Sequence, residues 1–336
     1  MFQPYTVKHR IEQTARSHEM TKTALILLNY NDAPSLLSAL ERGLSLRGID
    51  LCVAVDNGSA DDSLQKIIAG IQDGKDRESA SAAGSGEVYS SGRVCVIETG
   101  KNGGYGSGNN AGVRAAAEHG CDLSLIANPD VIFEEDTVKA LKEAVLAGEN
   151  VMAAGAVMEG RSPEECAWPL KGFREELFAS GPVSRRLYKK DIYYAPSYFG
   201  EDFHRALSGK DTGRLQPVPV GAVHGSLVMV RTKEFLDLGG FDEEMFLFGE
   251  ERVLGRKIAA AGGKVVLVPA KYRHAGSGTM KKIGLDAVKR EKERLKSEAY
   301  YYEKYLGAGA DELKFAEAFQ NAVLFETKLA ARLGFL

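Results

Sequence analysis

The sequence between residues 23 and 148 alternates short apolar runs with amphipathic stretches, and this order limits the possible folds more than any other feature. Four apolar runs have the length and composition of buried strands: 23–29, 51–56, 93–98 and 122–128. Four stretches between and after them have helical spacing or helix-end signals: 33–45, 59–71, 109–120 and 134–148. The alternation predicts an α/β fold with a mostly parallel sheet covered by helices.

The rest of the chain divides into less regular and more regular parts. Residues 73–92 are rich in Ser, Gly, Ala and charge, which favours a mobile surface insertion. Order returns after residue 220 with a strand, a helix and a strand at 225–231, 251–262 and 264–269. From Asp286 the tail reads as charged helix with apolar residues three and four apart, so it must pack on the main domain or on a partner subunit.

Composition excludes several classes of protein. A net charge of -3 argues against a nucleic-acid binder that works by bulk phosphate attraction. The four cysteines are widely spaced and include no CxxC pair, which favours buried free thiols in a reducing compartment. No stretch approaches the roughly 20 apolar residues of a membrane span, and the N-terminus lacks the apolar core of a signal peptide. We therefore expect a cytoplasmic protein.

Each predicted strand of the first half is followed by acids or amides. The four strand ends read NYND (29–32), DNGSADD (56–62), TGKNGGYGSGNN (99–110) and NPDV (128–131). Asn, Asp, Gly and Pro are also the usual turn residues, so each stretch alone is equally explained as a turn. In open α/β sheets, however, ligands bind outside the carboxyl ends of the strands. Four polar ends in succession therefore predict a binding site at this edge.

The glycine run TGKNGGYGSGNNAG (99–112) is not a known nucleotide motif. Gly104, Gly106 and Gly108 give G-x-G-x-G after the third strand, where a dinucleotide fingerprint needs G-x-G-x-x-G after the first. No P-loop pattern occurs anywhere in the sequence. We expect the run to form a wall of the ligand site, with its glycines letting the backbone approach the ligand. The asparagine pair Asn109–Asn110 is expected to start the next helix.

The blocks LILLNYND, VAVDNGSADDS, KNGGYGSGNNAGV, IANPDV, GSLVMVRTKEFLDLGGFDEEMFLFGEE and GGKVVLVPAKYRHAGSG resemble, in this order, those of family 2 inverting glycosyltransferases. The rhamnosyltransferase-like branch, which has NPD in place of DxD, is the most similar. The resemblance implies a GT-A fold, a Rossmann-like, mixed and mainly parallel sheet flanked by helices. It implies a transferase domain at 21–282, an N-terminal extension at 1–20 and a C-terminal helical region at 283–336.

The resemblance also implies the donor site. Asp56 corresponds to the acid that contacts the base or ribose of the nucleotide, and Asp130 to the acid that holds a divalent metal, Mg²⁺ or Mn²⁺. His274 matches a late histidine that completes the metal site or touches the diphosphate. The remaining residues expected around the nucleotide-sugar are Asn29, Asn31, Asn57, Asn102, Gly103, Asn109, Asn110, Asn128, Gly225 and Ser226. A helix N-terminus after the glycine run would favour the diphosphate.

Catalysis is expected from FLFGEERVLGR. The family has Glu-Asp here, with the Asp as base, whereas this chain has Glu250-Glu251, so Glu251 aligns with the base and Glu250 with its neighbour. The next family acid is replaced by Val253. Both glutamates would also favour a helix N-terminus through its dipole, which is the structural alternative. Asp242 and Trp168 are expected on the acceptor side.

The implied reaction moves a sugar with inversion from dTDP-rhamnose or a UDP-hexose to a hydroxyl of a saccharide or lipid-linked acceptor, in cell-surface polysaccharide synthesis. One alternative is a catalytically silent sugar-nucleotide or glycan-binding protein, because Glu251 and Val253 depart from the family pattern. Another is a sugar nucleotidyltransferase, although NYNDAPS stands where such enzymes have a glycine-rich basic loop. The aromatic and basic tail is a candidate for peripheral membrane contact or for a homodimer interface.

Overall fold

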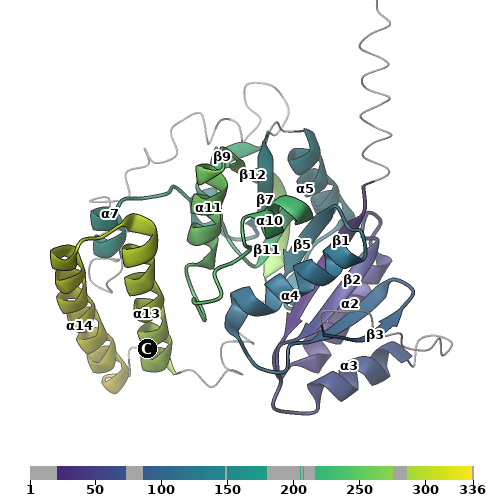
Figure 1. Cartoon of the computed structure of the whole chain (residues 1–336), viewed down its shortest axis with the longest axis horizontal. Helices are drawn as coiled ribbons and strands as arrows, with labels where there is room; N and C mark the ends of the chain where they lie inside the picture. Colours follow the sequence, from purple (N-terminus) through teal and green to yellow (C-terminus); the bar gives the residue numbers. More distant parts are fainter. Residues whose placement is uncertain are drawn as a thin grey trace, which may run out of the picture.

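A ten-stranded mixed sheet forms the centre of the molecule (Figure 1). The computed structural model describes residues 21–72, 86–147, 150–179, 205, 207, 216–274 and 286–334. The expected N-terminal extension and most of the expected insertion at 73–92 lie outside these residues.

The strand order in the sheet is β3-β4-β2-β1-β5-β11-β7-β12-β6, and β9 also pairs with β12. The bounds of these strands are β1 Thr23–Asn29, β2 Leu51–Asp56, β3 Glu87–Ser91, β4 Val94–Glu98, β5 Leu123–Ala127, β6 Val131–Ile132, β7 Val151–Met158, β9 Val218–Val220, β11 Leu227–Arg231 and β12 Lys264–His274. A separate two-stranded sheet pairs β8 (Ala167–Trp168) with β10 (Ala222–Val223).

The first half of the sheet is parallel and the second half is mixed. Strands β4, β2, β1 and β5 run parallel, with Asn29 opposite Asp56 at the ends of β1 and β2. Strand β11 lies antiparallel between β5 and β7, so its first residues reach the edge at which the parallel strands end. Strand β12, parallel to β7, finishes at the same edge with His274. The predicted mixed sheet is confirmed.

Helices cover both faces of the sheet. One face packs against α2 (Ala33–Ser45), α3 (Ser63–Gln72) and α5 (Glu135–Ala147), through buried residues such as Leu36, Ile67 and Leu141. The other face packs against α4 (Gly104–Glu118), α10 (Thr232–Asp237) and α11 (Glu250–Ala260), through residues such as Val113 and Phe235. The short helices α6 (Pro163–Cys166) and α7 (Phe173–Phe178) follow β7.

The C-terminal region is a hairpin of α13 (Ala287–Leu306) and α14 (Ala310–Arg332), which lies to one side of the sheet in Figure 1. Tyr301 and Tyr302 of α13 are fully buried in a cluster with Val253 of α11 and Leu177 of α7. Of the two surfaces expected for the tail, the main domain or a partner subunit, the structure shows packing on the main domain. No helix within the described residues is long and apolar enough to cross a membrane.

Three expectations about the helices and strands of residues 86–158 differ from the structure. Helix α4 begins at Gly104 rather than at Asn109, so most of the glycine run is helical. Strand β3 occupies Glu87–Ser91, inside the segment expected to be a mobile insertion. Strand β7, VMAAGAVM, pairs with both β11 and β12 in a region for which no strand was predicted. The four cysteines are free and buried, as expected.

Candidate active site

Asp56 ends β2 at the carboxyl edge of the sheet, and its carboxylate is held by neighbouring groups. Oδ1 accepts hydrogen bonds from Asn29 Nδ2 at 2.8 Å and from Ser59 Oγ at 2.6 Å, while Oδ2 accepts from the Ser59 backbone N–H at 3.1 Å. The side chain is buried. Because a carboxylate oxygen has two lone pairs, Oδ2 retains capacity for a further donor such as the N–H of a uracil or thymine ring.

Asn31, in the loop after β1, hydrogen-bonds to the loop that follows Asp56. Its backbone adopts a left-handed conformation with φ 55°, and its side-chain Oδ1 accepts a hydrogen bond from the Ala60 N–H at 2.8 Å. Its own N–H donates to Ser59 Oγ at 2.9 Å. The two loops expected to contact the nucleotide are therefore joined to each other through Ser59.

Asn57 and Asn102 connect the second loop to the start of α4. Asn57 Nδ2 donates to Asn102 Oδ1 at 3.1 Å and to the Gly104 carbonyl at 3.0 Å. Asn102 Oδ1 also accepts from the Gly104 N–H at 3.0 Å, and Gly103 is the N-cap residue of α4. These contacts place the N-terminus of α4 beside Asp56, where the positive end of a helix dipole would favour an anion.

The glycines of the run pack against the protein itself. A Cβ at Gly108 would lie 2.3 Å from Leu28 Cδ1, and one at Gly112 would lie 2.4 Å from Ile26 Cγ2. Gly104, at φ 91°, would clash with the Phe246 carbonyl. The expectation that these glycines open the backbone to a ligand is corrected at these positions. They let α4 lie directly on the sheet and on the loop before α11.

Asn109 and Asn110 lie inside α4 and face the protein. Asn110 Nδ2 donates to the Phe241 carbonyl and to Glu243, and its Oδ1 accepts from the Phe241 N–H at 2.9 Å. Asn109 Nδ2 donates to the Tyr105 carbonyl one turn earlier at 3.0 Å. Asn110 therefore fixes the loop at 241–243, a different place from the nucleotide contact that the resemblance implies.

Asp130 and His274 come together at the end of the sheet. His274 Nε2 lies 3.2 Å from Asp130 Oδ1, and the two side chains are 19% and 17% exposed. The antiparallel pairing of β12 with β6 sets this contact, with His274 opposite Val131. The two residues that the resemblance assigns to a metal thus present an oxygen and a nitrogen ligand side by side.

A cavity of about 500 Å³ opens beside His274. His224 and Trp168 line it, with ring centroids 6.0 Å apart, and His224 in turn lies 6.1 Å from the His274 ring. Burial lowers the pKa of His224, against the opposing effect of Glu251. The Ser226 N–H donates to His224 Nδ1 at 3.2 Å, so the neutral ring carries its proton on Nε2.

Glu251 lines the same cavity from the first turn of α11. Its Oε1 accepts a hydrogen bond from the Gly225 N–H at 3.2 Å, and a Cβ on Gly225 would lie 2.8 Å from that oxygen. Tyr105 of α4 donates to the Gly225 carbonyl at 2.6 Å. The Asn128 N–H donates to the carbonyl of Ser226 at 3.0 Å, which ties the end of β5 to the same segment. Glycine at 225 is therefore required for the close approach of Glu251.

Glu250 points away from solvent. Burial, reinforced by the neighbouring Glu251 carboxylate, raises the pKa of Glu250 to about 8. Among the described residues no group hydrogen-bonds to its buried Oε1. The preceding residues Phe248 (φ 74°) and Gly249 (φ 92°) are both left-handed and turn the chain sharply into α11. Strain of this kind in a non-glycine residue is common at functional sites.

Asp242 holds the C-terminal hairpin. Its Oδ2 accepts hydrogen bonds from Tyr300 and Lys304 at 3.0 Å each and from Tyr305, all on α13, and its Oδ1 accepts from the Glu244 N–H. Burial alone would raise the pKa of Asp242, but the hydrogen bonds, led by those of Tyr305 and Lys304, lower it to about 2. The residue expected near the acceptor thus binds α13.

Sequence reasoning did not assign two parts of the cavity wall. His224 was visible in the sequence but had no assigned role, because a single histidine gives no indication of its neighbours. Arg294 and Glu298 of α13 also line the cavity, next to Arg252 of α11. A tail helix gives no sequence signal for the surface it covers, so this contribution required the structure.

Comparisons with known proteins agree with this arrangement. The model of "Glycosyl transferase family 2" matches residues 24–203, more than half of the chain. Over 187 residues the chain is 28% identical to N-acetylglucosaminyl-diphospho-decaprenol L-rhamnosyltransferase of Mycobacterium tuberculosis. That alignment covers 53% of this chain and 57% of the relative, so the similarity spans less than two thirds of the curated protein.

Solved structures share the fold at low sequence identity. GalNAc-T7, solved with UDP, GalNAc and Mn²⁺, is 14% identical with a TM-score of 0.54, over 90% of this chain and 54% of that one. The mannosyltransferase PcManGT of Pyrobaculum calidifontis, solved with GDP-Man and Mn²⁺, is 16% identical with a TM-score of 0.52, over 99% and 84%. The fold is that of the GT-A glycosyltransferases. Since the family model matches more than half of the residues and the fold agrees, this chain belongs to glycosyl transferase family 2.

Proposed function

We propose that the chain transfers a sugar from a nucleoside diphosphate-sugar to an acceptor hydroxyl with inversion at the anomeric carbon. The observation that carries the proposal is the meeting of the Asp130–His274 pair, Glu251 and Gly225 around one end of the sheet, beside a cavity. A candidate for holding the diphosphate and a candidate base thus lie on the same side of the fold. The family match favours transfer over the nucleotidyltransferase alternative.

The donor nucleotide would lie along the strand ends from Asp56 to Asp130. Asp56 is anchored by Asn29 and Ser59, so its carboxylate is oriented before a ligand arrives. The start of α4 faces the same region and suits a diphosphate. We propose dTDP-rhamnose as the donor. The name of the mycobacterial relative, an L-rhamnosyltransferase, and the NPD sequence at 128–130 support this choice over a UDP-hexose.

A divalent metal suits the Asp130–His274 pair. The carboxylate and the imidazole lie 3.2 Å apart and each is partly open to solvent, so one ion could reach both. Mg²⁺ or Mn²⁺ bound by few protein ligands takes the rest of its coordination from water and phosphate oxygens. Such an ion would neutralise charge on the departing diphosphate. Mn²⁺ in the GalNAc-T7 and PcManGT structures supports this assignment.

Glu251 is our candidate for the base. The Glu251 side chain lines the cavity, and the Gly225 N–H orients its Oε1 by a hydrogen bond. The carboxylate can therefore face an acceptor hydroxyl that enters the cavity. A carboxylate in that position removes the hydroxyl proton as the oxygen attacks the anomeric carbon. The neighbouring Glu250 is buried, and its raised pKa keeps its carboxyl protonated and neutral near pH 7. Glu250 therefore adds no second negative charge beside Glu251. Trp168 offers an aromatic face in the same cavity for an acceptor sugar ring.

We further propose that the acceptor is lipid-linked and that α14 rests on the membrane at the cytoplasmic face. Three apolar side chains of α14, Phe315, Phe325 and Leu329, are exposed, as is that of its C-cap residue Leu333. Lys328 and Arg332 of α14 lie next to these apolar residues in the sequence. The first half of α13, which packs against α14, adds three exposed lysines: Lys289, Lys292 and Lys296. An apolar helix face with a basic border suits an anionic lipid surface. A homodimer through the same face is the competing explanation.

The decisive experiment is calorimetric titration of the protein with dTDP-rhamnose and UDP-sugars, with and without Mn²⁺ or Mg²⁺, while donor hydrolysis is followed. Metal-dependent binding and slow hydrolysis of one donor would support the proposal, and NMR of the product's anomeric configuration with an acceptor would test inversion. Failure to bind any of these donors would overturn it. Binding without turnover, unchanged by Glu251→Asp, would favour a silent binding protein.

A further inference from the structure

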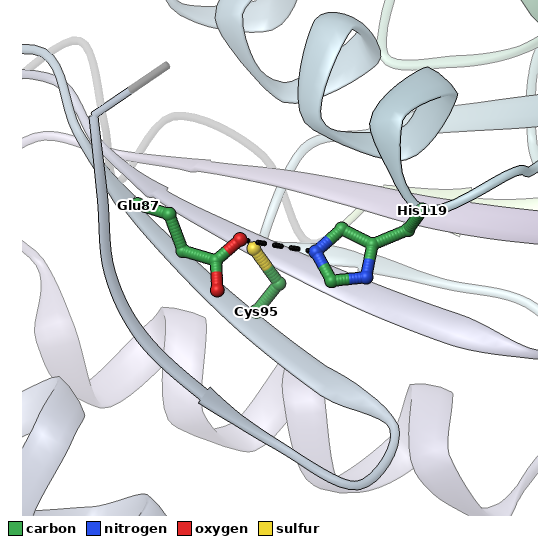
Figure 2. A group of neighbouring side chains, drawn as sticks. All are labelled: Glu87, Cys95 and His119. Carbon is green, nitrogen blue, oxygen red and sulfur yellow. Dashed lines mark hydrogen bonds and ion pairs between the residues drawn. The ribbon is translucent and has the colours of Figure 1, made fainter. Parts of the chain in front are cut away.

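Glu87, Cys95 and His119 form a second cluster of metal-ligand side chains, away from the cavity (Figure 2). One ligand atom from each residue lies within 4.8 Å of the other two. Glu87 comes from β3, Cys95 from β4 and His119 from the C-cap of α4. None of them lines the cavity. The fold thus brings a carboxylate, a thiol and an imidazole together at the edge of the sheet.

An irregularity in β3 points Glu87 toward this cluster. Glu87 pairs with Ile97 and Tyr89 with Val96, so the register shifts between the two residues. Tyr89 packs in the core on the α2 and α3 side, whereas Cys95 belongs to the core on the α4 side. A β-bulge re-aims a side chain in this way. Without the shift, simple alternation would place Glu87 on the same face as Tyr89.

The three side chains differ in exposure in a way that suits a bound ion. Cys95 is fully buried and the Glu87 side chain is 4% exposed, while the His119 side chain is 33% exposed and opens a route from solvent. His119 Nε2 lies 3.0 Å from Glu87 Oε2. Burial, together with the Glu87 carboxylate, raises the pKa of the Cys95 thiol. The Cys95 thiol and the Glu87 carboxyl, which can both be anionic, are therefore buried next to each other.

We propose that Glu87, Cys95 and His119 bind a transition-metal ion of the Zn²⁺ class. The ion would take the thiolate sulfur, a carboxylate oxygen and an imidazole nitrogen, and a water would complete a tetrahedral set. Binding would displace the thiol proton to solvent. Tetrahedral Zn²⁺ ligands lie about 3.3 to 3.6 Å apart. Glu87 and His119 are already 3.0 Å apart, and a ligand atom at the 4.8 Å limit would have to approach by roughly 1.2 Å.

This site would differ in chemistry from the Asp130–His274 pair. That pair has no sulfur and suits a hard ion such as Mg²⁺ or Mn²⁺, whereas a thiolate selects softer ions. An ion at Glu87, Cys95 and His119 would tie the outermost hairpin, β3–β4, to the C-terminal end of α4. Since the N-terminal end of α4 faces the proposed donor site, the ion would stiffen the helix from its far end.

Cobalt spectroscopy tests the proposal separately from the transferase reaction. Co²⁺ is added to the full chain and the thiolate-to-Co²⁺ charge-transfer band in the near ultraviolet is recorded. We expect one equivalent to produce the band, Zn²⁺ to abolish it, and a tenfold excess of Mg²⁺ to leave it unchanged. Cys95→Ser should eliminate it. Cys52→Ser, a buried strand thiol on the opposite face of the sheet, should retain it.

His119→Gln provides a second variant, because this residue is partly exposed and its replacement should leave the core intact. We expect at least tenfold weaker Zn²⁺ binding in competition with Co²⁺. Absence of the band in the unmodified protein, or a band that survives Cys95→Ser, would overturn the proposal. Failure of donor binding would leave these spectra unaffected, so the two proposals fail separately.

Discussion

His274 Nε2 lies 3.2 Å from Asp130 Oδ1, although 144 residues separate the two in the chain. The contact depends on the last residues of β12 pairing antiparallel with the short strand β6, directly after Asp130. His274 is therefore held by the sheet, and Asp130 lies in the hydrogen-bonded turn that leads into β6. Under the proposed function, a pair fixed in this way would not need to be ordered before an ion and a diphosphate bind.

Asp130→Asn tests the metal assignment. The substitution keeps the shape of the side chain but removes its charge, so we expect at least tenfold weaker donor binding in the presence of Mn²⁺ and little change without it. Calorimetry with the donor at two metal concentrations measures both. Asp136→Asn, an exposed acid in the first turn of α5, is the matched control. An equal loss in both variants would remove Asp130 from the metal site.

Glu251→Gln tests the base. Loss of a general base typically costs about 10²- to 10⁴-fold in rate, so we expect a fall of that size in kcat with donor affinity largely retained. Product formation and donor binding are measured on the same samples. Glu251→Asp should recover part of the rate. A Glu251→Gln enzyme with unchanged kcat would mean that another group takes the proton.

Glu250→Gln should change the dependence of stability on pH. The pKa of Glu250 is raised from 4.5 to about 8, so between these values the folded state holds a proton that the unfolded state has released. Stability of the normal protein therefore falls as pH rises through this interval. Gln cannot ionise, so the free energy of unfolding of the variant should exceed that of the normal protein by an amount that grows from pH 5 to pH 8. Urea unfolding at several pH values measures it, and a constant difference would contradict the assignment.

Asp242→Asn should loosen α13. Hydrogen bonds to a charged group contribute about 1.5–3 kcal/mol, so we expect a loss of this order in the free energy of unfolding at neutral pH. The pKa of Asp242 is lowered from 3.8 to about 2, so this contribution is present above pH 3.8 and is lost as pH falls toward 2. The two proteins should converge there in urea unfolding.

The same variant should raise KM for the acceptor more than for the donor, because α13 lines the cavity. Asp237→Asn changes an exposed acid that pairs with Lys233, and it should leave both stability and KM near their normal values.

Phe325→Glu tests the membrane proposal. Phe325 is 68% exposed, and introducing a charge there should weaken binding to vesicles of anionic phospholipid at least tenfold in a flotation assay. Asn321→Glu places the same charge one turn earlier on the exposed side of α14 and should weaken it less. Equal effects would show that charge alone governs binding. Concentration-dependent dimerisation abolished by Phe325→Glu, without vesicle binding, would assign the face to a second copy of the chain.

Much of this architecture was predictable because the first half of the chain follows simple periodicity. Strands β1, β2 and β5 and helix α2 were predicted closely, since each is an apolar run or an amphipathic stretch with clear ends. Strand β7 was missed because VMAAGAVM is rich in alanine and glycine, which have low strand propensity. Pairing with β11 and β12 on both sides stabilises it regardless.

The glycine run shows where local reasoning fails. Six glycines in fourteen residues favour a loop by propensity, yet α4 begins at Gly104. Gly108 lies against Leu28 and Gly112 against Ile26, both from β1 about 80 residues earlier, so these two positions have no room for a side chain. Such contacts are long-range and cannot be read from the local sequence. Asp56 and Asp130 were identifiable as strand-end residues because the edge of a parallel sheet collects such residues wherever they lie in the chain, whereas His274 was identified through the family resemblance.

Helix α13 lies between the cavity and α14, with Arg294 and Glu298 on one side and the contacts to α14 on another. If α14 rests on lipid, the two helices α14 and α13 separate the bilayer from the cavity, a distance of about 20 Å. A lipid-linked acceptor could then keep its tail anchored while its sugar head enters the cavity. The enzyme would have no need to extract its substrate, and the bilayer itself would confine the acceptor to the neighbourhood of Glu251.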